Sequence, residues 1–515
     1  MNYKTFILLF IIIVIITIII GLWPTISKPV VAEKPREMVT GERWLQHLEK
    51  DLIPWWLMET AKGEPVGNFP TFRCDNGELV NLAEICPTFS KLGPDDTWIT
   101  NNLNKKYIVP QSRQVYAYGV AYHLTGNPEF LKLAKVGVDW IREYGLDREN
   151  GGAFTYFEGE ELRPGPNVLQ RTSQDLAYTL LGMAFYYYLT LDQSVLSDII
   201  EIKDFIFENY YNSNQDIMMR QPIQVASEDS EGQWKGLPMQ LDQMNTYMML
   251  LTPLLPEPLQ SQWKEDLVHL SRIMMNQFYS PEYNIFRFRI DNNTQREIIN
   301  LNDPGFVSNN NDYGKSIKAF FMIYLTGKMV NNERLISFAQ TNASRLLESA
   351  YDSDSGTWGL RFILDENGEV INDLDKIWWV YTELDQMAAT LSLEDSSYID
   401  KYLKSTVNWW LENMVDHQNH EVWNKLTWPE LTPKLPKQYQ WKNGFHSHEH
   451  VVVGYITAQA TQNQPVTLYF ARKQGQENDG IRPYYYTGKV TEIKTEPLPS
   501  VPEINKVTVT FTDII

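Results

Sequence analysis

Basic residues are scarce in this sequence, and they form no cluster. The 45 Lys and Arg residues are outnumbered by 64 Asp and Glu residues, which gives a formal net charge of −19. Binding to nucleic acid requires a basic face that neutralises phosphate groups. We therefore expect no nucleic-acid partner.

Cysteine is almost absent as well. Cys74 and Cys86 are the two cysteines among the 515 residues. In an oxidising compartment, a lone pair this close in sequence usually forms one disulfide that closes a loop. We expect that disulfide, with two buried free thiols as the alternative. A metal site is not expected here, because no histidine lies near the pair in the sequence.

Charge is missing from one long segment near the start of the chain. Phe6 to Trp23 is almost wholly aliphatic, and its length suits a helix that crosses a hydrocarbon core of about 30 Å. We expect residues 1–23 to be a single-pass membrane anchor, residues 24–37 to be an extended linker, and the rest of the chain to be periplasmic or extracellular. A cleaved signal peptide is the alternative.

The remainder of the chain follows a repeated pattern. Between turn-like segments rich in Asp, Asn and Gly lie paired stretches whose apolar residues return every three or four positions, as on one face of a helix. Residues 113–124 and 127–145 are one such pair. The turn-like segments begin at Gly67, Leu146, Tyr210, Tyr279, Tyr351 and Val415.

Six helix hairpins of this kind predict an all-α fold, the (α/α)6 barrel, over residues 38–462. Six inner helices would form a ring, and six outer helices would surround it. An open α-solenoid is the alternative, but its repeats are usually shorter. Over residues 463–515 β-branched and aromatic residues alternate, which predicts a small β-rich extension.

Polar residues open the apolar stretches that we assign to the inner helices. A closed barrel brings these positions to one mouth, where they would form a site. Helix capping accounts for some polar residues at helix starts, but cations at these positions oppose the helix dipole. The candidate site residues are Arg113, Asp175, Gln243, Asn245, Lys315, Lys318, Trp379, Glu383, His446 and Glu449.

Four stretches of the sequence carry a family resemblance. They are SRQVYAYGVAYHLTGNPEFLKLAKVGVDWI from Ser112, RTSQDLAYTLLGMAFYYYLT from Arg171, KIWWVYTELDQMAATL from Lys376 and WKNGFHSHEH from Trp441. The third, with its Lys-x-Trp-Trp-x-x-x-Glu pattern, is the most specific. Over about residues 43–460 the chain resembles the N-acylglucosamine 2-epimerase and cellobiose 2-epimerase superfamily, and this resemblance implies the (α/α)6 fold.

The resemblance also implies an activity and roles for individual residues. Enzymes of this superfamily act on sugars with a free reducing end, and they use histidines to remove and return a proton next to the carbonyl. The family arginine falls on Arg113, the Trp-Trp-Glu helix on Trp379 and Glu383, and the C-terminal catalytic histidine on His446.

The chain departs from the family at the other catalytic positions. The family Gly-His-x-x-Glu segment falls on GKSIK, so Lys315 stands in place of the histidine and Lys318 in place of the glutamate. A further family histidine falls near Gln243 or Asn245. Glu449 stands where the family commonly has an arginine.

Three interpretations of this altered site follow. Lys315 acts as a base or as a Schiff-base amine on an open-chain sugar, with His446 as the acid. Alternatively, the carboxylates of Asp175 and Glu383 perform glycoside hydrolysis or lyase chemistry. In the third, catalysis is lost and the barrel binds glycan in envelope polysaccharide metabolism.

We predict the first interpretation, a sugar epimerase or isomerase. His446, Lys315 and Glu383 would be catalytic. A mono- or oligosaccharide would be bound by Arg113, Asp175, Gln243, Asn245, Lys318, Trp379 and Glu449.

A metal site is a further hypothesis for the histidine-rich segment. His446 and His450 lie four residues apart, so on a helix they share a face, where His448 or Glu449 would assist them as ligands. Such a site needs a third ligand, and the family resemblance supplies none. We expect neither a metal nor another cofactor.

Overall fold

The computed structural model describes residues 37–159, 161–226, 235–290, 312–364, 369–476, 480–498 and 503–515. Met38–Ile515 forms one compact unit. The predicted anchor, residues 1–23, and the predicted linker, residues 24–37, lie outside these ranges apart from Glu37. Among the helices within these ranges, none has both the length and the apolar character needed to cross a membrane.

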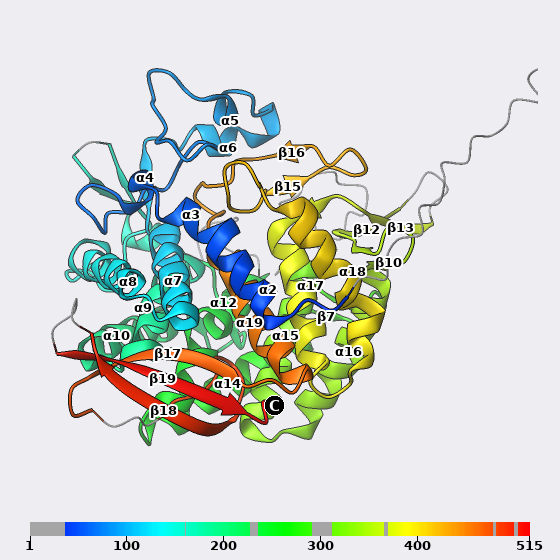
Figure 1. Cartoon of the computed structure of the whole chain (residues 1–515). Coiled ribbons are helices and arrows are strands. Elements are labelled where there is room, and N and C mark those ends of the chain that lie inside the picture. Colours follow the sequence, from blue (N-terminus) through cyan, green and yellow to red (C-terminus); the bar gives the residue numbers. More distant parts are fainter. Residues whose placement is uncertain are drawn as a thin grey trace, which may run out of the picture. The chain divides into compact units, whose positions relative to one another are not determined.

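Six helical segments form an inner ring in the described part of the chain. They are buried on nearly all sides, as expected of helices that are apolar all round. Each segment contacts the next one along the chain, and the last contacts the first, so the ring is closed and an open solenoid is excluded. The inner segments are α7 (Ile108–Thr125), α9 (Ser173–Thr190), α12 (Leu237–Gln243) with η5 (Met244–Met248) and α13 (Met249–Leu251), α15 (Tyr313–Val330), α17 (Trp378–Leu391) and α19 (Phe445–Thr461) (Figure 1).

A second layer of helices surrounds the ring. These helices are amphipathic: α16 (Glu333–Ala350) buries Leu335, Ala339, Ala343 and Leu346, which lie on one face. The first outer segment, which begins with α2 (Gly41–Gln46), packs against α19. The other outer helices are η1 (His47–Leu52) and α3 (Ile53–Trp56), α8 (Pro128–Trp140) with η3 (Ile141–Gly145), α10 (Gln193–Tyr210), α14 (Leu259–Ile273) with η7 (Met274–Phe278), and η8 (Ile399–Leu403) with α18 (Lys404–Trp409) and η9 (Trp410–Met414).

The turn-like segments of the sequence connect these helices, several of them as short antiparallel hairpins. In one, Tyr351 pairs with Trp358 around Gly356, whose φ of 66° suits a residue without a side chain. The paired strands are β1 (Lys105–Tyr107), β2 (Tyr156–Glu158) and β3 (Arg163–Gly165); β4 (Tyr211–Asn212) and β5 (Ile217–Met218); β6 (Lys235–Gly236) and β9 (Arg289–Ile290); β7 (Tyr279–Ser280) and β8 (Ile285–Phe286); β10 (Tyr351–Asp352) and β11 (Thr357–Trp358); β12 (Arg361–Leu364) and β13 (Val370–Asp373); and β14 (Lys376–Ile377), β15 (Lys425–Leu426) and β16 (Pro433–Lys434).

The loop between α3 and α7 has a small core of its own. Phe72, Phe89 and Ile99 pack there with Tyr439 from a distant loop. Cys74 and Cys86 form the predicted disulfide within the same segment. The short helices of this loop are α4 (Glu59–Lys62), α5 (Pro87–Ser90), η2 (Pro94–Asp96) and α6 (Thr97–Thr100), and those of other loops are η4 (Val168–Gln170), α11 (Ile223–Ala226) and η6 (Thr252–Leu254).

The C-terminal residues form an antiparallel sheet of β17 (Val466–Lys473), β19 (Ile504–Thr512) and β18 (Lys489–Pro497), in that order (Figure 1). Alternate side chains of β17 and β19 are buried against the barrel, whereas the side chains of β18 are exposed. β17 contacts α7, α9 and α19. The hydroxyl of Tyr122 near the end of α7 donates a hydrogen bond to the carbonyl of Phe470 at 2.9 Å. The sheet is thus joined to the inner ring.

Gly182 marks the closest approach of α7 and α9. A Cβ atom at this position would lie 2.4 Å from the carbonyl oxygen of Ser112 and 2.6 Å from Cβ of Val115. The backbone N–H of Gly182 also donates a hydrogen bond to the Ser112 hydroxyl at 2.8 Å. The two inner helices can be this close only because position 182 has no side chain.

We expect Gly182→Ala to lower the free energy of unfolding by about 1–3 kcal/mol. The clash is with backbone, which cannot turn aside, and its cost exceeds the gain in helix propensity of about 1 kcal/mol. Urea denaturation of the purified protein measures the change. Gly93→Ala is the control, because a Cβ atom there would meet nothing within 4 Å. Equal stability of the two variants would contradict the prediction.

Candidate active site

His446 lies in the first turn of α19, where the local sequence fixes its position. Asn443 precedes the helix, and its side-chain oxygen accepts a hydrogen bond from the backbone N–H of Phe445 at 3.2 Å. The Asn443 amide donates to the carbonyl of Pro110 in the first turn of α7 at 3.0 Å. The start of the last inner helix is therefore tied to the first inner helix.

The imidazole of His446 is held by Glu383 of α17. Its Nδ1 lies 2.9 Å from Oε1 of Glu383, and the rings of Trp378 and Trp379 lie 6.0 and 6.1 Å away. Burial, and then the charge of Arg113, lower the pKa of His446 well below its ordinary value. The ring is therefore neutral near pH 7. With Glu383 as a carboxylate, Nδ1 carries the proton and Nε2 keeps its lone pair.

Lys318 of α15 links this pair to a second carboxylate. Its Nζ lies 2.9 Å from Oε2 of Glu383 and 2.9 Å from Oε2 of Glu449. Burial opposes the charge of Lys318, but the two carboxylates raise its pKa above the ordinary value. The other oxygen of Glu449 accepts hydrogen bonds from the hydroxyls of Tyr484 (3.0 Å) and Tyr485 (3.4 Å). These residues form a continuous buried chain of contacts that ends at His446.

The same cluster has the composition of a metal site. Ligand atoms of Glu383, His446 and Glu449 all lie within 4.8 Å of one another. The ammonium group of Lys318, however, already bridges the two carboxylates at 2.9 Å. A metal ion would have to displace this buried cation, so the donor set does not favour a metal.

Arg113 of α7 lies beside the start of α19. Its guanidinium lies over the ring of Tyr178 at 4.2 Å and near the rings of Trp441 and Phe445 at 5.6 and 5.5 Å. It donates a hydrogen bond to the carbonyl of Trp441. Arg113 thus contacts the ring of Phe445, the residue next to His446 in the sequence. Its role in sugar binding stays a prediction.

Asp242 is a site residue that the sequence reasoning missed. It is buried on α12 and accepts hydrogen bonds from Gln174 (2.7 Å) and from the hydroxyl of Tyr178 (3.4 Å). Burial raises the pKa of Asp242 to about 6, although the charges of Arg113 and Lys318 act in the opposite direction. Asp242 lies in the stretch LDQMNTYMM, from which site residues were predicted. The π-helical turn η5 begins two residues after Asp242 and shifts the helical register.

Gln243 has protein partners at both ends of its side chain, and its predicted binding role stays a prediction. Gln243 is fully buried, its amide donates to the carbonyl of Ser173 at 3.1 Å, and its oxygen accepts from the hydroxyl of Tyr247 at 3.0 Å. Both ends of the side chain are used to join inner helices. Asn245 is also buried, and its carbonyl accepts a hydrogen bond from Tyr485 at 3.3 Å; its binding role stays a prediction.

Lys315 does not have the environment expected of a free amine. Its Nζ lies 2.6 Å from Oδ2 of Asp312, and its backbone N–H donates to Oδ1 of the same carboxylate at 2.8 Å. The amine is therefore paired with a carboxylate, and the expected role of Lys315 as a base or Schiff-base lysine stays a prediction. The ammonium lies 5.1 Å from the ring of Trp379. Lys315 and His446 therefore both flank Trp379.

Two other residues predicted to bind sugar, Asp175 and Glu449, contact other groups of the protein. Asp175 occupies the third position of α9, and its backbone N–H donates to the side chain of the N-cap residue Thr172 at 3.0 Å. The Asp175 carboxyl in turn accepts hydrogen bonds from the side chains of Thr172 and Thr155. Glu449 is fully buried, and its partners are Lys318 and tyrosines. Its binding role stays a prediction.

The two adjacent tryptophans at the start of α17 differ in exposure. Trp378 is buried in the core, whereas Trp379 is partly exposed and contacts His446 and Lys315. Trp379 is therefore the ring that remains available to stack on a sugar.

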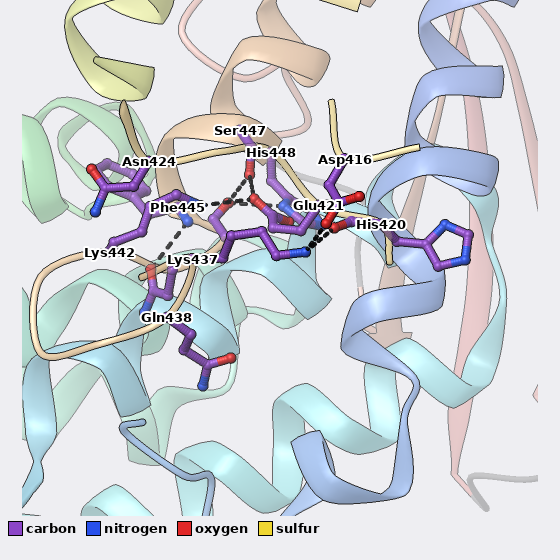
Figure 2. A network of polar contacts seen from close by, with 12 residues as sticks. Asp416, His420, Glu421, Asn424, Lys437, Gln438, Lys442, Phe445, Ser447 and His448 are labelled. Atoms are coloured by element: carbon purple, nitrogen blue, oxygen red, sulfur yellow. Dashed lines mark hydrogen bonds and ion pairs between the residues drawn. The ribbon is translucent and has the colours of Figure 1, made fainter. Parts of the chain in front are cut away.

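A separate buried ion pair supports the segment that carries His446. Lys442 and Ser447 both contact the carboxylate of Glu421 (Figure 2). The Nζ of Lys442 lies 3.1 Å from Oε1 of Glu421, and the Ser447 hydroxyl donates to the same oxygen at 2.9 Å. Trp56 donates to Oε2 at 2.7 Å. Burial opposes ionisation of Glu421, but Lys442 holds its pKa below the ordinary value. Glu421 has a φ of 61°, a strained backbone that the surrounding contacts maintain.

Comparison with solved structures identifies the class of fold. The chain is similar to a D-mannose isomerase, with a TM-score of 0.65 and 15% identity over 80% of this chain and 97% of that chain. It is also similar to the cellobiose 2-epimerase of Bacillus thermoamylovorans B4167, with a TM-score of 0.63 and 15% identity over 81% of this chain and 98% of that chain. At such identities these likenesses establish a shared fold.

The family follows from the sequence match. Residues 89–436 match the family model of N-acylglucosamine 2-epimerase (GlcNAc 2-epimerase), and the chain belongs to this family. Among curated proteins, no sequence matches the chain.

We expect Asp242→Asn to abolish a pH-dependent loss of stability. Because the folded state holds the Asp242 proton up to about pH 6 and the unfolded state loses it near pH 4, the wild type loses stability as pH rises through this window. The pKa difference corresponds to about 3 kcal/mol. Urea denaturation at pH 4 to 7 should show the variant gaining that much relative to the wild type. If the free energies of unfolding of the variant and the wild type changed in parallel over this pH range, the prediction would be contradicted. The exposed Asp354→Asn is the control.

We expect Glu421→Gln to lower the free energy of unfolding by about 3–5 kcal/mol, because it leaves the buried Lys442 ammonium without its counter-charge. Combining it with Lys442→Met should restore part of the loss, since the double variant has no unpaired charge at this position. Chemical denaturation at pH 7 compares the three proteins. A double variant less stable than Glu421→Gln would show that the charge pair is not the cause.

Proposed function

We propose that this chain is a carbohydrate epimerase or isomerase that transfers a proton at the carbon next to the carbonyl of an open-chain sugar. The observation that carries the proposal is the pairing of His446 with Glu383. It leaves the Nε2 of a neutral histidine as a base, as proton abstraction requires. Family membership supports the same reaction class.

The remaining residues have complementary roles in this proposal. The Lys315 ammonium stabilises the negative charge that develops on the carbonyl oxygen as the proton leaves. Trp379, between Lys315 and His446, stacks on the sugar. Glu383 orients His446 and stabilises the imidazolium form after proton transfer, as a carboxylate does in other histidine sites. Arg113 binds a sugar hydroxyl or the ring-opened carbonyl.

The substrate in this proposal is a mono- or oligosaccharide with a free reducing end. Glycoside hydrolysis is not favoured, because the two carboxylates considered for it are otherwise engaged. Asp175 takes part in a helix cap, and Glu383 is paired with Lys318 and His446.

We place this activity outside the cytoplasm as part of the same proposal. The Cys74–Cys86 disulfide suits an oxidising compartment. The uncharged run from Phe6 to Trp23 suits an N-terminal anchor.

We expect the wild type in heavy water to exchange the proton next to the carbonyl of at least one free sugar, as followed by proton NMR across a sugar library. His446→Gln should reduce this exchange by a factor of about 10²–10⁴, because it removes the base. Lys315→Met should reduce it by a smaller factor. The exposed His417→Gln is the control. A wild type that binds sugars without any exchange would contradict the proposal and favour glycan binding.

A further inference from the structure

We propose that Tyr484 and Tyr485 of the C-terminal extension are positioning residues for the active site. They hold Glu449 as a counter-charge of Lys318, and this fixes the pairing of Glu383 with His446. The inference rests on the proposed role of His446 as the base.

The two tyrosines reach the barrel interior from the segment just before β18. Tyr484 is fully buried and Tyr485 nearly so, and their rings lie 3.9 Å apart. The hydroxyl of Tyr484 lies 3.0 Å from Oε1 of Glu449 and 2.9 Å from the hydroxyl of Tyr116 on α7. The hydroxyl of Tyr485 lies 3.4 Å from Oε1 of Glu449 and 3.3 Å from the carbonyl oxygen of Asn245, and its one proton is shared between these two acceptors. The extension therefore contributes side chains to the core of the ring as well as covering it.

The backbone at Tyr484 is held in an unfavourable conformation. Its φ is 56°, a region that bulky side chains rarely adopt. Its N–H donates to the hydroxyl of Tyr188 at 2.9 Å, and that hydroxyl donates to the carbonyl of Arg482 at 2.6 Å. Such strain persists only where surrounding contacts fix it. Here those contacts direct the Tyr484 hydroxyl to Glu449.

These residues are outside the part of the chain that matches the family. The match covers residues 89–436, whereas the tyrosines belong to the extension after α19. His446 lies after the matched residues as well, so the histidine and the tyrosines that act on it both belong to the part of the chain beyond the match.

The link between the tyrosines and His446 is electrostatic. Glu449 is fully buried, and its carboxylate contacts Lys318 and the hydroxyls of Tyr484 and Tyr485. A buried carboxylate is costly without such partners. Burial, and then the charge of Glu449, raise the pKa of both tyrosines well above their ordinary value, so they remain donors.

Removing the two phenol donors would disfavour the Glu449 carboxylate. The charge of Lys318 would then act on Glu383 alone, and Glu383 would become a weaker acceptor for the Nδ1 proton of His446. The titratable and charged groups around this path are Lys318, Glu383, Glu449, His446, Tyr116, Arg113, Lys442 and Asp242.

The test measures the protonation state of the His446 ring directly. In the ¹⁵N-labelled full chain at pH 7, the His446 signals are assigned by their loss in His446→Gln. We expect the wild type to show a protonated Nδ1 and an unprotonated Nε2. Tyr484→Phe/Tyr485→Phe should shift these signals toward a mixture of both tautomers, and kcat for the exchanged sugar should fall about tenfold with KM little changed.

Tyr486→Phe is the matched control from the same segment. Tyr486 is buried like its neighbours, but its hydroxyl bonds Thr390 at 2.8 Å and not Glu449. It should lose a buried hydrogen bond and some stability while the His446 signals stay unchanged. An equal shift in Tyr486→Phe would mean that the tyrosines act only through packing, which would overturn the proposal.

Glu449→Gln tests the same step without disturbing the tyrosine segment. It should give the tautomer mixture seen in the double variant, and it carries the test if the double variant fails to fold. Unchanged His446 signals in either variant overturn the proposal. If the wild type exchanges no sugar proton, the proposed function fails, but the ring signals still decide whether the tyrosines control His446.

Discussion

The active centre depends on one buried cation shared between two buried carboxylates. Lys318, Glu383 and Glu449 come from α15, α17 and α19, so the three charges meet only when the inner ring is closed. Each charge alone would be costly to bury, and their mutual contacts offset that cost. Because Glu383 also contacts His446, closure of the ring also fixes the orientation of the His446 imidazole, the proposed base.

The need to satisfy these charges without water explains much of the surrounding chemistry. Phenol hydroxyls provide donors on rigid rings that also fill space. The oxygen of Glu449 that does not contact Lys318 is instead contacted by tyrosines of the segment before β18. The second buried pair, Glu421 with Lys442, follows the same rule at the start of α19. The aromatic-rich composition is thus partly a consequence of burying ions.

Much of the site could be predicted from the sequence, because its residues occupy the starts of helices and helix starts can be recognised from neighbouring residues. His446 and Glu383 were predicted from motif positions at helix starts, and the structure brings them to 2.9 Å. Asp242 was missed because a π-helical turn changes which residue faces the centre. The carboxylate partner of Lys315, Asp312, was not expected, because it precedes the helix as a cap.

The sequence by itself determined the helical hairpins, the disulfide pair, the family and the β-rich character of the last fifty or so residues, because apolar periodicity, cysteine spacing and motifs are properties of neighbouring residues. The tertiary structure alone decided which charges share a partner and where the extension packs. Lys318 and Glu449 are 131 residues apart, and Tyr484 and Tyr116 are 368 apart. No local sequence pattern specifies such pairs. They form only when packing buries the polar groups, so that water can no longer act as their partner.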